Sequence, residues 1–363
     1  MSIDAVLDAK IVVCAGSGGV GKTTISAAIA LAAAARGRET IVLTIDPAKR
    51  LANSLGLEQL PNEPVEISKE LFEQAGIAAA PLHAMMLDTK STFDELVFSY
   101  AKNRQRAEKI INNRFYQAIS GALSGTHEFM AMEKLYELNN RHRYDLIVID
   151  TPPTRNALDF LDAPKRMTSF LEGRLLKWFL LPAIGGGKGI FKIANFAAVQ
   201  FLKVVQKIVG AQVLADTAEF FANFEGMYEG FKQRAQSVYD LLREPTTSFV
   251  VVTAPNEQAV DEALFFARTL NSYKLEFGGL VVNRLHPHFE TKGIKGGTPL
   301  LDALIKIASD FAKVRIREER SLNLLEREIP LGRWAKVPFL TEDVSDLASL
   351  NQVANHLFDG SLL

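Results

Sequence analysis

The sequence contains a single cysteine, Cys14, among 363 residues. One thiol forms no disulfide within its own chain and supplies no Cys-x-x-Cys metal site. Cys14 lies inside an apolar run, where a cysteine behaves as a small buried side chain. A fold held together by disulfides is therefore excluded for one chain.

Strong net charge and long apolar runs are also missing. The formal net charge is −1, so the chain as a whole gives no electrostatic reason to bind nucleic acid. No uninterrupted apolar run approaches the roughly 20 residues that a membrane-spanning helix needs. The first ten residues are mixed and partly acidic, unlike a signal peptide. We therefore expect a cytoplasmic protein without a nucleic-acid partner.

The most informative stretch that is present is a glycine-rich loop at residues 16–24. Residues 11–14 precede it as an apolar run that predicts a buried strand, and an alanine-rich run from Ile25 predicts a helix. Between Gly16 and Thr23 the sequence matches the phosphate-loop pattern G-x-x-x-x-G-K-[ST]. The strand–loop–helix context favours a nucleotide site over an ordinary glycine turn.

The residue types in this loop suit a polyphosphate. Glycines let backbone N–H groups curl around phosphate oxygens without Cβ clashes, and the following helix adds a favourable dipole. Lys22 is expected to neutralise the β- and γ-phosphates, and the Thr23 hydroxyl is expected to ligate Mg²⁺.

Two aspartates end predicted strands farther along the chain. Residues 39–46 form an apolar run that ends on Asp46, at the sheet edge where doubly wound folds place their ligands. A helix-capping or turn role for Asp46 is the alternative. Residues 144–150 end on Asp150 and have the Walker B pattern, a buried strand that presents a carboxylate to magnesium.

Further strands and helices alternate along most of the chain, which predicts an α/β fold. Strands are expected at residues 82–88, 248–254, 277–283 and 335–340. Helices are expected at residues 92–119, 128–141, 256–271 and 300–328, and from residue 343. The predicted nucleotide-binding domain comprises residues 1–95, 126–163 and 244–363, and the predicted helical subdomain comprises residues 96–125 and 164–243.

The helical subdomain is rich in Phe, Leu and Val and has no good strand. Residues 165–210 hold eight Lys or Arg side chains and one acid, so an anionic membrane surface is a candidate partner. Its apolar side chains either form a closed bundle or line a groove for a hydrophobic helix. In the second case residues 170–182 and 191–202 form the walls, with Met227 and Phe231 nearer the floor.

Together these segments resemble the arsenical-pump (ArsA) ATPase family, which includes the ATPases that target tail-anchored membrane proteins. The glycine-rich loop is similar to the family's deviant Walker A loop. Asp46-Pro-Ala resembles its switch I, and the six residues from Asp150 to Arg155 resemble its switch II. Val282-Asn283 resembles the adenine-contacting segment, and residues 336–340 resemble the loop that closes over the base.

The resemblance implies a doubly wound, mostly parallel sheet of the P-loop NTPase type with an inserted α-helical subdomain. It implies a homodimer that hydrolyses ATP with Mg²⁺, in which Asp46 orients water and Lys22 is the second catalytic residue. The metal ligands are then Thr23, Asp46 and Asp150. The nucleotide-binding residues are then Gly16, Ser17, Gly18, Gly19, Val20, Gly21, Lys22, Thr23, Thr24, Asn283, Pro338 and Phe339.

The chain departs from the family at three places. Serine occupies position 17, where the family usually has a lysine that reaches the partner's nucleotide; Arg155, Arg50 and Lys49, in that order, are the candidates to replace its charge. The Cys-x-x-Cys that binds zinc between some targeting subunits is absent, so no intersubunit zinc is expected. The thiols that bind arsenite in pump members are also absent, which disfavours an arsenite or anion pump.

Two functions of different classes stay open. The first is an ATP-driven targeting factor for hydrophobic transmembrane segments, which the Phe- and Leu-rich insertion favours. The second is a nucleotide switch of the partition or cell-division type that acts at a membrane surface. In both, the protein is cytoplasmic and able to bind peripherally at a membrane.

Overall fold

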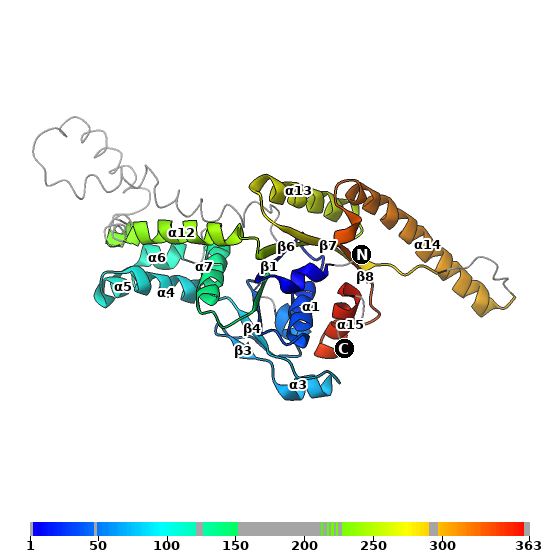
Figure 1. The fold of residues 1–363 in the computed structure, drawn as a ribbon, viewed down its shortest axis with the longest axis horizontal. Helices are drawn as coiled ribbons and strands as arrows, with labels where there is room; N and C mark the ends of the chain where they lie inside the picture. Colours follow the sequence, from blue (N-terminus) through cyan, green and yellow to red (C-terminus); the bar gives the residue numbers. More distant parts are fainter. Residues whose placement is uncertain are drawn as a thin grey trace, which may run out of the picture. The chain divides into compact units, whose positions relative to one another are not determined.

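A computed structural model of the chain describes residues 3–46, 49–120, 126–151, 227–289 and 297–358, with residues 212, 216, 217, 219, 220 and 223 (Figure 1). The chain divides into two compact units, each built from segments that are distant in sequence. The first unit comprises Met1–Leu87, Leu135–Phe160 and Leu241–Leu363, and the second comprises Asp88–Lys134 and Leu161–Asp240. These two units do not test the domain boundaries expected from the sequence, which stay a prediction.

The first unit contains an eight-stranded sheet in the order β3-β4-β2-β5-β1-β6-β7-β8. Every pair of neighbouring strands is parallel except β3 and β4. The strands are β1 (Ile11–Ala15), β2 (Thr40–Thr44), β3 (Val65–Glu66), β4 (Leu82–Met86), β5 (Leu146–Asp150), β6 (Thr247–Thr253), β7 (Phe277–Leu285) and β8 (Trp334–Pro338). The predicted α/β fold with a mostly parallel sheet is confirmed.

Seven of these strands coincide with apolar runs that the sequence predicts, and β3 does not. Every residue of β1, β2, β5 and β6 is buried, as expected for parallel strands covered on both faces. β3 has two exposed residues and pairs antiparallel at the edge of the sheet. Because it buries nothing, it leaves no hydrophobic signal in the sequence.

Helices accompany this sheet in the first unit. The α-helices that lie wholly in it are α1 (Lys22–Ala35), α2 (Arg50–Ser54), α3 (Lys69–Gln74), α13 (Glu257–Tyr273), α14 (Pro299–Glu326) and α15 (Leu347–Leu357), with 3₁₀ helices η1 (Asp4–Asp8) and η3 (Leu331–Arg333). α1 packs against α15 and against β2 and β5, and its alanines permit a close approach. α13 packs against β6 and β7.

The order of the strands places the site. The chain leaves β1 toward β2 on one side, and after β5 it crosses to the other side of β1 to form β6. Ligands of open α/β sheets bind at the carboxyl ends of the strands near such a reversal. The glycine-rich loop follows β1 directly, so it lies at this point.

The second unit is helical in the part that the structure describes. It contains α4 (Thr89–Tyr100), α5 (Arg104–Ile111), α6 (Arg114–Ile119) and most of α12 (Tyr228–Leu242), while α7 (Thr126–Asn140) is shared between the units. The helix predicted over residues 92–119 is therefore three helices. Asn103 and Asn113 break it, because each side chain accepts hydrogen bonds from the backbone of the next helix as an N-cap.

Aromatic side chains form the core of the second unit. Phe231 contacts the rings of Phe93, Tyr100 and Phe129, and it is 2% exposed, as is Met227. The two predicted floor residues of the groove are thus core residues. The predicted walls, residues 170–182 and 191–202, lie outside the described residues.

None of the helices in the described part of the chain is both long enough and apolar enough to span a membrane.

Candidate functional site

A cavity of about 740 Å³ lies where β1, β2, β5, β7 and β8 end. It brings together nine of the residues that the sequence nominates for nucleotide or metal binding. These are Gly19, Gly21, Lys22, Thr23, Thr24, Asp46, Asn283, Pro338 and Phe339. Segments that are distant in the chain, from Gly19 to Val353, therefore meet at one cavity.

Lys22 opens α1 and is buried beneath the loop, with 6% of its surface exposed. Its Nζ donates a hydrogen bond to the carbonyl oxygen of Ser17, 2.8 Å away. Burial lowers the pKa of Lys22, while the nearby carboxylates of Asp150 and Asp46 act in the opposite direction. The two acids, which lie at the ends of neighbouring strands, thus partly offset the effect of burial on the Lys22 ammonium group.

Asp150 is the fully buried last residue of β5. Its Oδ2 accepts hydrogen bonds from Thr23 Oγ1 at 2.7 Å and from Thr44 Oγ1 at 2.8 Å. Its Oδ1 has no hydrogen-bond partner among the described residues. Burial raises the pKa of Asp150 to about 6, although the two hydroxyl groups and Lys22 lower it.

This arrangement of oxygens suits a hard cation. Mg²⁺ prefers carboxylate and hydroxyl oxygens and keeps several waters. The Thr23 hydroxyl, in the cavity lining, and the unpartnered Oδ1 of Asp150, which is buried behind Thr23 and is not a lining residue, supply such donors. The residues present therefore fit a magnesium ion.

The residue that follows β5, Thr151, is hydrogen-bonded to β1. Thr151 donates its hydroxyl to the carbonyl oxygen of Cys14 at 2.8 Å, and it lines the cavity. Cys14 is buried in β1, and burial raises the pKa of its thiol to about 12. It is the small buried side chain that the sequence predicts.

Asp46 lies just beyond β2, with 16% of its side chain exposed. Its backbone N–H donates to Thr44 Oγ1 at 3.2 Å, and its Oδ2 accepts from Arg50 at 3.3 Å. Thr44 thus connects the backbone of Asp46 to the Asp150 carboxylate. The ion pair with Arg50 was not anticipated from the sequence.

Asn283 and Arg284, at the end of β7, hold the glycine-rich loop from outside. Asn283 Nδ2 donates to the carbonyl oxygen of Val20 at 2.8 Å, and Arg284 donates to that of Gly19 at 2.9 Å. Gly21 has φ +94°, and a Cβ there would lie 2.2 Å from Asn283 Nδ2. Glycine is therefore required at position 21 both by its backbone conformation and by the neighbouring asparagine.

Gly16 is required by a different neighbour. A Cβ on Gly16 would lie 2.1 Å from the carbonyl oxygen of Val252 in β6. Gly16 does not line the cavity of about 740 Å³, so its role there is to let the loop leave β1 beside β6.

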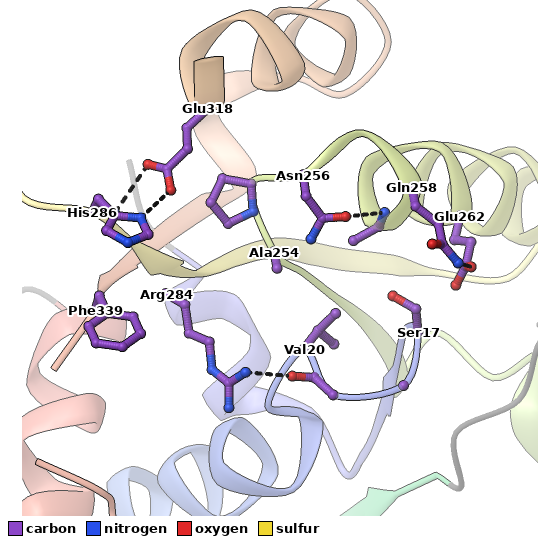
Figure 2. A pocket seen from close by; sticks show the side chains of 14 residues that line it. Ser17, Val20, Ala254, Asn256, Gln258, Glu262, Arg284, His286, Glu318 and Phe339 are labelled. Carbon is purple, nitrogen blue, oxygen red and sulfur yellow. Dashed lines mark hydrogen bonds and ion pairs between the residues drawn. The ribbon is translucent and has the colours of Figure 1, made fainter. Parts of the chain in front are cut away.

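A second cavity, of about 670 Å³, lies on the other side of the loop (Figure 2). Ser17, Gly18 and Val20 line this cavity rather than the first one. Gly19, Arg284 and Phe339 line both. The predicted loop residues are therefore divided between two adjoining cavities.

Phe339 follows β8 and is 53% exposed. Its ring stacks on that of His286, with 5.4 Å between the centroids and 8° between the planes. His286 is in turn paired with the buried Glu318 of α14, as Figure 2 shows. One face of the Phe339 ring is therefore packed on His286, and about half of the residue's surface is exposed.

Several lining residues were not nominated from the sequence. They are Asn53, Ser54, Arg284, Glu342, Asp343, Val344 and Val353. Arg284 adjoins the predicted Asn283, which is the only sequence signal for it. Arg155 and the rest of the predicted switch II after Thr151 lie outside the described residues.

The strand order and the loop between β1 and α1 define the class of protein, a P-loop nucleotide-binding fold. Comparison with known families identifies the member. Residues 9–359 match the family described as anion-transporting ATPase, so the chain belongs to this family and is an ATPase. The resemblance inferred from the motifs is confirmed.

Named relatives are similar at low identity. ATPase GET3 of Malassezia globosa is 27% identical over 76% of this chain and 72% of its own length. Putative arsenical pump-driving ATPase 1 of Aquifex aeolicus is 23% identical over 96% of this chain and 78% of its own. ATPase GET3C of Arabidopsis thaliana is 25% identical, with coverage of 92% and 78%.

Proposed function

We propose that this ATPase hydrolyses Mg·ATP in the cavity of about 740 Å³ and uses the nucleotide state to control binding of hydrophobic, transmembrane-type helices. The observation that carries the proposal is the buried Asp150 carboxylate, bonded to Thr23 and left with one unpartnered oxygen among the described residues. Burying an ionised carboxylate costs free energy unless a cation compensates its charge.

Each residue around the phosphates has a distinct task in this proposal. Lys22 neutralises phosphate charge from beneath the loop, and the loop's N–H groups bind phosphate oxygens. Thr23 and Asp150 hold Mg²⁺ directly or through water. The ion supplies charge stabilisation for the transferred phosphoryl group.

Asp46 is the residue that orients the attacking water. It lies at the cavity wall, with its backbone fixed by Thr44 and its carboxylate paired with Arg50. Positioning of this kind is most of what a protein contributes to phosphoryl transfer, since little covalent chemistry falls to the protein. Phe339 and Pro338 close over the base in the same proposal, and Asn283 forms the adjacent wall.

We further propose that the active form is a homodimer. Eleven large apolar side chains are exposed among the described residues, and six of them lie on α14. Leu300, Leu304, Ile307 and Val314 follow one another at four-, three- and seven-residue spacing, which places them on one helix face. A concentration of exposed apolar side chains marks a contact surface. A second copy of the chain is the partner proposed for it.

Arsenite transport is the less favoured function, although one relative carries a pump-driving name. The only thiol is that of Cys14, which is buried and has its pKa raised to about 12. A trivalent metalloid binds soft thiolate ligands. Cys14 is neither accessible nor ionised, so it offers no such ligand.

Steady-state ATP hydrolysis with and without Mg²⁺ tests the first part of the proposal, with Lys22→Ala as the negative control. Co-purification of the chain with a transmembrane-segment peptide, compared with pelleting on anionic liposomes, tests the second part. Peptide capture supports a targeting factor. Liposome binding without peptide capture would favour the membrane-surface nucleotide switch instead.

A further inference from the structure

The end of β7 contains a bulge that turns Arg284 toward the phosphate loop. Between its pairings with β8, β7 advances three residues, from Val282 to Leu285, while β8 advances two. Arg284 has φ +61°, a left-handed conformation that is unfavourable for a residue with a Cβ. Bulges beside functional sites commonly re-aim a side chain. Here the re-aimed side chain is that of Arg284.

The guanidinium of Arg284 reaches the loop itself, as Figure 2 shows. Its NH1 donates to the carbonyl oxygen of Gly19 at 2.9 Å, while its backbone N–H donates to Asn283 Oδ1 at 3.0 Å. An arginine has five N–H donors in a rigid plane. The single contact with Gly19 therefore leaves donors on the same group beside the loop.

The charge of Arg284 is not matched by an acid in the described part of the chain. No ion pair of Arg284 is found there, whereas Arg50, the other arginine of the same cavity, is paired with Asp46. Arg284 is exposed and lines the cavity together with Lys22 and Thr23. A guanidinium in that position suits the paired oxygens of a phosphate.

We propose that Arg284 is a second phosphate-binding cation of the site, which contacts the phosphate chain of the bound nucleotide while the bulge keeps it at the loop. This inference rests on the proposed function, because it requires that the cavity bind a nucleotide. It differs from the role of Lys22, which approaches the loop from beneath. It also explains the unfavourable backbone conformation at position 284, which directs the side chain to the loop.

Equilibrium binding of ATP to the full chain tests the proposal, using Arg284→Gln, Arg284→Lys and the control Arg268→Gln. Arg268 lies on α13 and pairs with Glu328, away from both cavities. Arg284→Gln is expected to weaken ATP binding about tenfold to a hundredfold, the range for hydrogen bonds to charged groups. Arg284→Lys keeps the charge, and its affinity for ATP is expected to lie between that of Arg284→Gln and that of wild type. Arg268→Gln is expected to bind as wild type does.

Two further readouts separate phosphate binding from a purely structural clamp. The affinity of inorganic triphosphate, measured by competition, should fall in Arg284→Gln by about the same factor as the affinity of ATP. The midpoint of thermal unfolding should be nearly unchanged without nucleotide, and its rise on adding ATP should shrink. A clamp would instead lower the midpoint of the free protein.

Wild-type ATP affinity in Arg284→Gln would overturn the inference, as would a loss for ATP that inorganic triphosphate does not share. The proposed function fails by a different result. If Lys22→Ala bound ATP as tightly as wild type, the cavity would not be the nucleotide site, whatever Arg284 does.

Discussion

Thr23 donates its hydroxyl to the buried carboxylate of Asp150, with 2.7 Å between Oγ1 and Oδ2. The bond joins the start of α1 to the end of β5, two elements that are separated by 127 positions in the chain. Thr44 donates to the same oxygen, so the end of β2 and the start of α1 are both bonded to the carboxylate that ends β5. Burial nevertheless dominates, and it raises the pKa of Asp150 to about 6.

The raised pKa of Asp150 predicts a specific pH dependence of stability in the absence of nucleotide and metal. The folded pKa of about 6 exceeds the value of 3.8 for a free aspartate, so between these values the folded chain binds more protons than the unfolded one. The free energy of unfolding therefore falls as pH rises through this window. The contribution amounts to about 3 kcal/mol, since one pKa unit corresponds to about 1.4 kcal/mol.

Denaturant unfolding of wild type and Asp150→Asn at pH 4 and pH 7 measures this contribution. The difference in unfolding free energy between the two proteins should shift by about 3 kcal/mol against wild type at the higher pH. Adding Mg·ATP at pH 7 should recover stability in wild type only. A difference that does not change with pH would contradict the buried, unpaired state of the carboxylate.

Lys22→Ala and Asp46→Asn should both stop ATP turnover, but at different steps. Lys22 is buried beneath the glycine-rich loop and is proposed to neutralise the phosphates, so its loss should weaken ATP binding. Asp46 is proposed to position water, so Asp46→Asn should bind ATP and lose about a hundredfold or more in kcat. ATP affinity and single-turnover rates separate the two effects. Turnover at the wild-type rate in Asp46→Asn would exclude it as the water-orienting residue.

Serine at position 17 leaves a role for another cation during hydrolysis, with Arg155, Arg50 and Lys49 as the predicted candidates in that order. The structure adds that Arg50 is paired with Asp46 and that Lys49 precedes α2, while Arg155 lies outside the described residues. An arginine finger contributes a factor of about 10³ or more to kcat. Alanine substitution of each, with kcat measured over a range of protein concentrations, identifies it. Three unaffected variants would remove all three candidates.

The sequence predicts this site well where a residue's chemistry is local. The pattern from Gly16 to Thr23 and the Walker B run that ends on Asp150 each occupy contiguous residues, and the structure places them at the ends of β1 and β5. Arg284 could not be predicted, because its position depends on a bulge relative to β8 and on a left-handed backbone. The Arg50–Asp46 pair depends likewise on how α2 follows β2.

The same distinction applies to the fold. Strands such as β6 are predicted because burial on both faces requires a continuous apolar run. The helix expected over residues 92–119 was wrong in its continuity, because asparagine caps at positions 103 and 113 outweighed the helical periodicity. β3 is held only by pairing with β4 and has no sequence pattern of its own.

The exposed face of α14 predicts which substitutions would disrupt the proposed homodimer. Leu304 and Ile307 are 52% and 53% exposed, and charge at either position should prevent apolar contact with a second copy. Leu304→Glu with Ile307→Glu should shift sedimentation toward the monomer and reduce protein-concentration-dependent ATPase activity. Lys306→Glu, an exposed charge reversal in the same turn, is the control. A double variant that sediments as wild type does would rule out α14 as the contact.

The last prediction concerns the groove of the helical subdomain, whose walls we expect in residues 170–182 and 191–202. Phe231 and Met227 are buried in the second unit, so the prediction of client binding concerns the wall residues, which lie outside the described residues. Phe179→Ser and Phe196→Ser should therefore reduce capture of a transmembrane-segment peptide without lowering the thermal midpoint. Phe231→Ala is the contrasting variant, because removing a buried phenylalanine costs about 3–5 kcal/mol.

Hydrophobic-dye binding should also differ between ADP and a non-hydrolysable ATP analogue, since loss of the γ-phosphate is proposed to move the groove through the segment after Asp150. Equal, low dye binding in both states, with no peptide captured, would mean that these side chains pack on one another in a closed bundle.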